Sequence, residues 1–315
     1  LGINLLPKGG KVCSFDCIYC ECGLNSERRT KNPLPTADEV VEGLEGKLQE
    51  LKAEGIVPDV LTFAGNGEPT LHPSFPEIVE RVRKVRDIYC PSAKMSILSN
   101  ATQIRRPEIR QALLLFDNNI LKLDTVCPAY INIVDRPQGH YDVEEQIRCL
   151  ELFRGQCIIQ TMLMRGEYEG HDLDNTGEAY IVPYLEALQR IKPRSVMLYT
   201  LDRETPVAGL LKASPEAMQA FAERIRHDAG LRVIERAAKA LSRPLRLIGV
   251  VFFAEITLLR LVIGAFQSLQ LAKILGQFGQ VLLILAGFLK FAAYALAVAF
   301  RLQHAQQREQ FFLLV

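Results

Sequence analysis

The sequence predicts an α/β fold built on a parallel β-sheet, and two observations favour it. Six short apolar runs rich in β-branched residues recur between residue 1 and about residue 230, and a stretch of helical periodicity follows each run. Neighbouring parallel strands need a helix-sized connection, so this alternation is typical of a parallel sheet. An open doubly wound sheet and a barrel-like sheet both fit the pattern.

The expected strands are short and are followed by Gly, Pro, Asn or Asp. They cover residues 3–7, 60–65, 94–100, 119–125, 157–164 and 195–201. The first expected helix, residues 36–54, begins with Thr36 and Glu39 at the spacing of a capping box and carries an apolar stripe. Five further helices are expected at residues 75–88, 107–115, 142–153, 177–191 and 215–229.

Residues suited to chemistry follow four of the expected strands. A cysteine cluster follows the first strand and the run GNGEPT follows the second, while Ser99 and Asn100 end the third strand and Asp124 ends the fourth. In both architectures the functional residues gather where the parallel strands end, at the carboxyl edge of the sheet. We therefore expect these four features to surround one pocket.

Three cysteines lie close together on the loop after the first strand, at Cys13, Cys17 and Cys20. No secretory signal precedes them, so we expect a reducing, cytoplasmic compartment in which clustered cysteines bind metal. Three thiolates can hold three irons of a four-iron cluster and leave the fourth iron open for a ligand. A structural zinc site with Cys22 as its fourth ligand is the alternative, although the spacing of Cys20 and Cys22 is uncommon in such sites.

The run CSFDCIYC, with the aromatic Tyr19 before its third cysteine, resembles the signature of the radical S-adenosylmethionine (radical SAM) superfamily. The longer runs LGINLLPKGGKVCSFDCIYCECG and TFAGNGEPTLHP are similar to a subgroup of Fe–S oxidoreductases related to wybutosine biosynthesis enzymes. The resemblance implies a partial (β/α)6 TIM-like barrel as the core domain, residues 1–230. It also implies that Cys13, Cys17 and Cys20 ligate a [4Fe–4S] cluster, whose fourth iron binds the amino and carboxyl groups of S-adenosylmethionine.

The run after the second strand resembles the superfamily's Gly-Gly-Glu-Pro element, which binds the amino group of the methionine moiety. In this chain the element consists of Gly65, Asn66, Gly67, Glu68 and Pro69, so an asparagine replaces the second glycine. Glycines let the backbone approach a ligand closely, and a carbonyl or carboxylate can accept hydrogen bonds from an ammonium group. An ordinary strand-to-helix turn is the alternative, because Gly and Pro mark turns in any case.

The resemblance also assigns Ser99 and Asn100 to the S-adenosylmethionine site, where their short polar groups would face a ribose or a carboxylate. A turn or capping pair is the alternative. Asp124, close to Lys122, is expected to face the cofactor or the substrate, with a structural ion pair as the alternative. Tyr19 is expected to pack near the adenine.

The function that the resemblance implies is one-electron chemistry. An electron from a flavodoxin- or ferredoxin-type donor splits S-adenosylmethionine, and the resulting 5′-deoxyadenosyl radical abstracts hydrogen from an unidentified substrate. Kinship with wybutosine enzymes suggests a tRNA base, although residues 1–230 contain 27 Lys/Arg and 33 Asp/Glu, a net charge of −6 that does not indicate an RNA-binding face. An iron–sulfur electron-transfer or sensor protein would explain the cysteines but not GNGEPT.

The last part of the chain, residues 231–315, differs in composition and contains 10 Lys/Arg and 3 Asp/Glu. We expect an apolar helical tail here, because residues 247–266 and 281–300 are both apolar and long enough to cross ~30 Å of hydrocarbon. Basic residues flank the pair, which predicts a two-helix hairpin that attaches the cytoplasmic core to a membrane. A fusion, a frame-shifted sequence and soluble packed helices are the alternatives.

Overall fold

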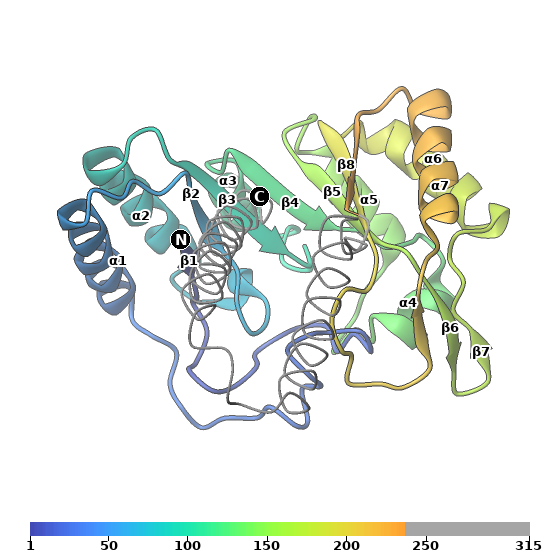
Figure 1. The fold of residues 1–315 in the computed structure, drawn as a ribbon, viewed down its shortest axis with the longest axis horizontal. Coiled ribbons are helices and arrows are strands. Elements are labelled where there is room, and N and C mark those ends of the chain that lie inside the picture. The colour runs from blue at the N-terminus through green and yellow to red at the C-terminus, as the bar shows by residue number, and fades with distance from the viewer. Residues whose placement is uncertain (237–315) are drawn as a thin grey trace, which may run out of the picture. The chain divides into compact units, whose positions relative to one another are not determined.

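A computed structural model describes residues 1–236, and its centre is a seven-stranded parallel sheet (Figure 1). The strands are β1 (Gly2–Ile3), β2 (Val60–Phe63), β3 (Lys94–Ser99), β4 (Asn118–Lys122), β5 (Ile158–Met162), β8 (Ser195–Tyr199) and β10 (Val233–Arg236). They lie side by side in chain order, β1-β2-β3-β4-β5-β8-β10, and every neighbouring pair is parallel. A doubly wound sheet requires a reversal of strand order, so this topology excludes that arrangement.

The helices alternate with the strands, as the sequence predicts. They are α1 (Ala37–Ala53), α2 (Phe75–Tyr89), α3 (Pro107–Leu113), α4 (Pro128–Val134), α5 (Val143–Glu151), α6 (Glu178–Ile191) and α7 (Pro215–Asp228). The predicted capping box of α1 is present: the Glu39 N–H donates to Thr36 Oγ1 at 3.2 Å, and the Thr36 N–H donates to Glu39 Oε2 at 2.7 Å. Helix α4 was not predicted from the sequence.

The two faces of the sheet are packed differently. Leu121 and Ile159 pack into a large apolar cluster to which six of the helices contribute, whereas their strand neighbours Ile120 and Ile158 belong to a small separate cluster with Met197. Side chains alternate between faces along a strand, so the helices cover one face and the other face encloses the small cluster. This is the arrangement of an α/β sheet that curves toward a barrel.

All six predicted strands are shorter in the structure, and side-chain hydrogen bonds account for the ends of two of them. The strand predicted at 157–164 stops at Met162, because Asn175 donates to the Met162 carbonyl at 2.8 Å and accepts from the Met164 N–H at 3.0 Å. The chain then leaves the main sheet and forms a small antiparallel sheet of β6 (Met164–Tyr168), β7 (His171–Asp172) and β9 (Leu210–Lys212). The strand predicted at 3–7 ends at Ile3, where Asn4 Oδ1 accepts the Leu6 N–H at 3.0 Å.

The sheet continues beyond residue 230, because β10 pairs with β8 from Val233 to Arg236. Within the described residues, no helix is both long and apolar enough to cross a bilayer. The apolar stretches 247–266 and 281–300, on which the membrane hairpin was predicted, lie outside the described residues.

Candidate functional site

The cysteine loop joins the carboxyl edge of the sheet through a short backbone pairing. Val12 forms an isolated parallel bridge with Gly67: the Val12 N–H donates to the Asn66 carbonyl at 3.2 Å, and the Glu68 N–H donates to the Val12 carbonyl at 2.8 Å. Cys13 is therefore held beside the GNGEP run that follows β2. Two of the four features that the sequence predicts around one pocket are thus directly connected.

The three candidate ligands have different polar neighbours. The Cys13 sulfur accepts a hydrogen bond from Asn100 Nδ2 at 3.5 Å, and burial raises the pKa of this thiol to about 11. Cys17 donates to Asp135 Oδ1 at 3.7 Å, and burial again raises its pKa. Cys20 is hydrogen-bonded to Cys22, and this bond, together with Lys11 nearby, lowers the Cys20 pKa to about 6.

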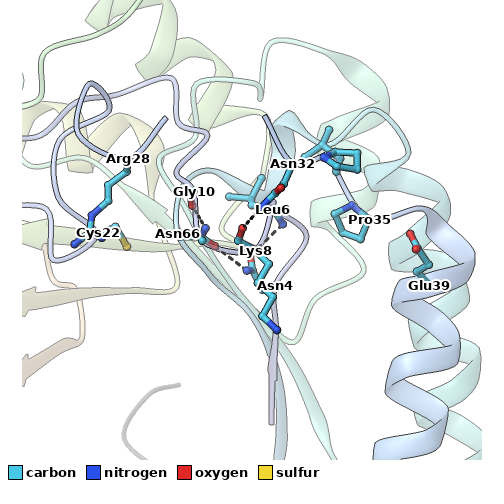
Figure 2. A pocket seen from close by; sticks show the side chains of 13 residues that line it. Asn4, Leu6, Lys8, Gly10, Cys22, Arg28, Asn32, Pro35, Glu39 and Asn66 are labelled. Carbon is cyan, nitrogen blue, oxygen red and sulfur yellow. Dashed lines mark hydrogen bonds between the residues drawn. The ribbon is translucent and has the colours of Figure 1, made fainter. Parts of the chain in front are cut away.

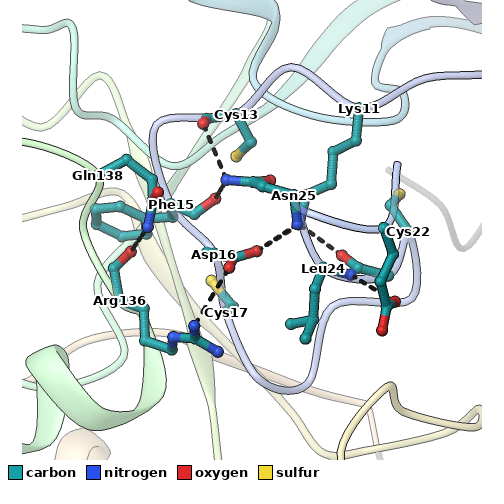
Figure 3. Close-up of polar contacts among 12 residues, drawn as sticks. Lys11, Cys13, Phe15, Asp16, Cys17, Cys22, Leu24, Asn25, Arg136 and Gln138 are labelled. Carbon is teal, nitrogen blue, oxygen red and sulfur yellow. Dashed lines mark hydrogen bonds and ion pairs between the residues drawn. The ribbon is translucent and has the colours of Figure 1, made fainter. Parts of the chain in front are cut away.

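The cysteine loop is held in shape by two side chains that bond to its backbone (Figure 3). Asn25 Nδ2 donates to the Phe15 carbonyl at 3.0 Å, and the Asn25 N–H donates to Asp16 Oδ1 at 2.6 Å. The buried Asp16 also pairs with Arg136 at 3.5 Å, which ties the loop to the end of α4. These contacts fix the positions of the cysteines without using any thiol.

Lys11 is a buried cation beside the loop. Its side chain is 1% exposed, and its Nζ donates to the Gly23 carbonyl at 2.7 Å and lies 3.7 Å from Asp16 Oδ1. The Lys11 ammonium lowers the pKa of Cys20, both by its charge and by a hydrogen bond. A buried positive charge therefore favours a thiolate at one of the three candidate ligand positions.

The donor set has the chemistry that an iron–sulfur cluster needs. All three candidate cysteines are free thiols, and each lies close enough to another candidate for their charges to influence one another. In the described part of the chain, no three His, Cys, Asp or Glu side chains converge on a point that could hold one metal ion. A four-iron cluster takes each thiolate on a different iron, so it needs no such convergence.

Glu68 joins the loops that follow β2 and β3. This carboxylate is 1% exposed, and it accepts hydrogen bonds from Ser99 Oγ at 2.8 Å, the Asn100 N–H at 2.5 Å and the Thr70 N–H at 3.0 Å. Burial raises the pKa of Glu68, while these bonds oppose the rise. These partners belong to the loops after β2 and β3, so Glu68 holds the two loops together.

Ser99 and Asn100 lie where the sequence predicts, at the end of β3. Ser99 Oγ accepts the Ala101 N–H at 3.0 Å as well as donating to Glu68, so it supports a turn. Asn100 reaches the cysteine loop, because its Nδ2 donates to Ser14 Oγ at 3.0 Å and contacts the Cys13 sulfur. Asn100 thus connects the third strand to the first candidate ligand.

The GNGEP run also holds the amino-terminal segment (Figure 2). Asn66 Nδ2 donates to the carbonyls of Pro7, at 2.9 Å, and Gly10, while its Oδ1 accepts from Asn4 Nδ2 at 2.7 Å. The asparagine that departs from the family's second glycine therefore binds residues 4–10. Pro69 begins a short 3₁₀ turn, Pro69–Leu71.

Contacts within the chain restrict both glycines of the run, Gly65 through a side chain and Gly67 through backbone. A Cβ on Gly65 would overlap Asn4 Oδ1, and one on Gly67 would overlap the Val12 carbonyl oxygen and lie 2.6 Å from its carbon. Gly67 also has φ +147°, which side chains disfavour. The structure thus places the Val12 backbone against Gly67, and close approach of a ligand to these glycines stays a prediction.

Asp124 and Lys122 form a buried ion pair at the end of β4, and Tyr19 joins it. The Tyr19 hydroxyl contacts Asp124 Oδ2, and Lys122 Nζ lies 4.8 Å from the centre of the Tyr19 ring. Lys122 also pairs with Asp135 Oδ1 at 2.8 Å, and burial raises the Asp135 pKa to about 7 although Lys122 opposes the rise. Tyr19 and Asp124, both expected near the cofactor, are therefore in direct contact.

Sequence reasoning missed Lys11, Asp16, Asn25 and Asp135. Asp135 ends the unpredicted helix α4, so its place beside Cys17 had no local signal. Asp16 and Asn25 lie within or close to the cysteine run. Their polar side chains in a metal-binding loop were the only signal that could have identified them. Nothing in the sequence distinguishes the buried Lys11 from the exposed Lys8.

The chain is similar to known proteins over about two thirds of its length. The Radical SAM superfamily model matches residues 8–176. A UPF0026 protein of Synechocystis is 31% identical over 217 residues, which are 66% of this chain and 72% of that protein. A GTPase Obg of Brachyspira hyodysenteriae is 29% identical over 212 residues, 65% of this chain but 28% of that protein, so this chain spans less than a third of its length.

The solved structures that share the fold include the following two. A radical SAM methyltransferase from Sphaerobacter thermophilus superposes with a TM-score of 0.55 and 17% identity, covering 77% of this chain and 67% of that one. Streptococcus suis SuiB bound to S-adenosylmethionine gives a TM-score of 0.52 and 14% identity, over 75% of this chain and 50% of that one.

Proposed function

This chain belongs to the radical SAM superfamily, whose cofactors are a [4Fe–4S] cluster and S-adenosylmethionine, and we propose that it is a radical-generating enzyme. When bound, this pair of cofactors supplies a 5′-deoxyadenosyl radical that removes a hydrogen atom from a substrate. We infer that the open sheet acts as the partial (β/α)6 barrel of the superfamily, with β10 as an additional strand.

One observation carries the proposal: the bridge between Val12 and Gly67 holds the cysteine loop against the GNGEP run. Cys13, Cys17 and Cys20 would hold three irons, and the adjacent run would bind the methionine moiety at the remaining iron. Asn100 supports this arrangement, because its side chain contacts the Cys13 sulfur from the end of β3. An iron–sulfur protein that only transfers electrons would not need a ligand-binding run fixed to its cysteine loop.

The residues around the ion pair would line the rest of the pocket. Asp124 and Tyr19 would face the ribose and adenine, and their mutual contact with Lys122 would hold them in place. Buried, mutually bonded polar groups keep their orientation, which positions a reactive atom against a substrate. Burial also excludes water from the place where a radical must survive.

The substrate class that we propose to test first is a base in tRNA. The similarity of the cysteine and GNGEP runs to wybutosine-related enzymes supports it, whereas the net charge of −6 over residues 1–230 does not. The experiment is anaerobic reconstitution, reduction with dithionite, and measurement of 5′-deoxyadenosine with and without bulk tRNA. Stimulation by tRNA, with a changed tRNA nucleoside in the digest, is the expected result. Equal rates with an unchanged digest would remove tRNA as the substrate.

A further inference from the structure

A broad groove lies beside the cysteine loop, between residues 4–10, residues 28–35 and the start of α1 (Figure 2). Its volume is about 810 Å³. Asn66 and Cys22 line it, but the candidate ligands Cys13, Cys17 and Cys20 do not, and neither does Asp124. The groove is therefore distinct from the part of the candidate cofactor pocket that these residues form, and it meets the GNGEP run at Asn66.

The groove is basic. Lys8 and Arg28 line it, both are exposed, and within the described residues neither has a carboxylate within 4.0 Å. The exposed Arg29 and Lys31 follow along the chain. Glu39 also lines the groove and keeps its negative charge, so the lining residues carry two positive charges and one negative charge, a net of +1. This local positive charge contrasts with the net charge of −6 over residues 1–230.

The wall of the groove leads directly to a candidate cluster ligand. Cys22 lines the groove, and its thiol lies near that of Cys20, two residues earlier on the same loop. Cys22 Sγ also donates to the Gly65 carbonyl at 3.7 Å, so it lies against the GNGEP run, whose Asn66 lines the same groove. An electron that arrives in the groove would therefore pass from the Cys22 thiol to Cys20, which is a candidate ligand of the cluster.

We propose that this groove is the docking surface for a small acidic protein that carries single electrons, of the flavodoxin or ferredoxin type. The inference rests on the proposed function, because reductive cleavage consumes an electron that another protein must supply. The carrier loses one electron at the groove and the cluster gains it, and no covalent bond forms or breaks. Complementary charge would orient the carrier and raise its association rate.

An RNA backbone is also acidic, but the position of the groove argues against it. A substrate has to approach the candidate cofactor pocket, where Asp124, Tyr19 and Asn100 lie, and none of these residues lines the groove. A carrier has to approach only a cluster ligand, and Cys22 provides that contact. The observations therefore favour the electron carrier, and RNA binding becomes an outcome of the test.

The test compares two reductants on the reconstituted full chain. Stopped-flow bleaching of the cluster absorption is followed with reduced flavodoxin and, separately, with dithionite, which is small and needs no docking surface. The variant carries Lys8→Glu with Arg28→Glu. The control carries Lys84→Glu with Lys94→Glu, an equal change of charge at exposed positions on α2 and at the start of β3.

The expected result is a bimolecular rate with flavodoxin that falls by about tenfold or more in the groove variant and stays within about twofold in the control. Rising salt should slow the parent strongly and the groove variant weakly. Iron content and the dithionite rate should match the parent. A groove variant that flavodoxin reduces as fast as the parent would overturn the proposal, as would an unchanged flavodoxin rate combined with lost tRNA binding. Cluster bleaching needs no turnover, so absence of 5′-deoxyadenosine would count against the proposed function alone.

Discussion

Replacing Gly67 by alanine should detach the cysteine loop, and the structure allows the cost to be worked out. A Cβ at this position would overlap the Val12 carbonyl oxygen and lie 2.6 Å from the carbonyl carbon, whereas ordinary contact begins at 3.4 Å, so the Val12 carbonyl group must move away by more than about 0.8 Å. That movement breaks two backbone bonds, from Val12 to Asn66 and from Glu68 to Val12. Each such bond contributes about 1 kcal/mol, and a side chain at φ +147° adds about 1–3 kcal/mol of strain.

The expected penalty of Gly67→Ala is therefore about 3–5 kcal/mol, which corresponds to a decrease in melting temperature of roughly 6–20 °C for a domain of this size. Cys13 is the next residue after Val12, so iron content after anaerobic reconstitution should fall as well. Gly9→Ala is the matched control: it lies in the neighbouring segment with φ +78°, but a Cβ there meets nothing within 4 Å. Its cost should be about 1 kcal/mol, with iron content unchanged.

The measurements are iron per chain, visible absorption and the melting temperature of the cluster-free protein. A Gly67→Ala protein with full iron content and a melting temperature close to that of Gly9→Ala would refute the reasoning. Full iron content combined with weak binding of S-adenosylmethionine would instead show that Gly67 faces the ligand and not the Val12 backbone.

Three further predictions concern single side chains. Cys22→Ala should retain most of the cluster absorption, whereas the same change at Cys13, Cys17 or Cys20 should abolish it; equal losses would overturn the assignment of ligands. Lys11→Met should cost about 1–3 kcal/mol in urea unfolding, because it removes the hydrogen bond to the Gly23 carbonyl and one of the two cations beside Asp16, while Lys47→Met at an exposed pair should change stability by less than about 1 kcal/mol. Burial raises the pKa of Asp135 to about 7, so this carboxyl holds its proton more tightly in the folded protein than in the unfolded chain. Its protonated form therefore stabilises the folded protein fully below about pH 4, and this stabilisation is lost as the pH rises through 7. Asp135→Asn should flatten that loss in cluster-free protein, and an unchanged pH profile would contradict the shift.

The alternation of strands and helices could be predicted because each element contains its own signal. The capping box at Thr36 and the apolar stripe of α1 are local, and the structure has both. Strand ends were less predictable, because side chains from distant residues set them. Asn175, which ends β5 at Met162, is an example that no local pattern in the strand contains.

The candidate site was also predictable only in part. Cys13, Gly67 and Asn100 come together because parallel strands end at one edge, which periodicity alone predicts. The roles of individual side chains depend on contacts across the fold. Lys11 is buried beside Asp16 and Cys20, and Asp135 meets Cys17 across 118 residues of sequence. Such partners follow from packing, and no spacing rule reveals them.

The central claim is that the cysteine loop and the GNGEP run form one radical-generating site. The measurement that tests it most directly is the appearance of 5′-deoxyadenosine and methionine when reconstituted protein is reduced with dithionite in the presence of S-adenosylmethionine. Equal amounts of both products from the parent, and neither from Cys17→Ala, are expected. A parent protein that carries a full [4Fe–4S] cluster, accepts electrons and leaves S-adenosylmethionine intact would contradict the claim.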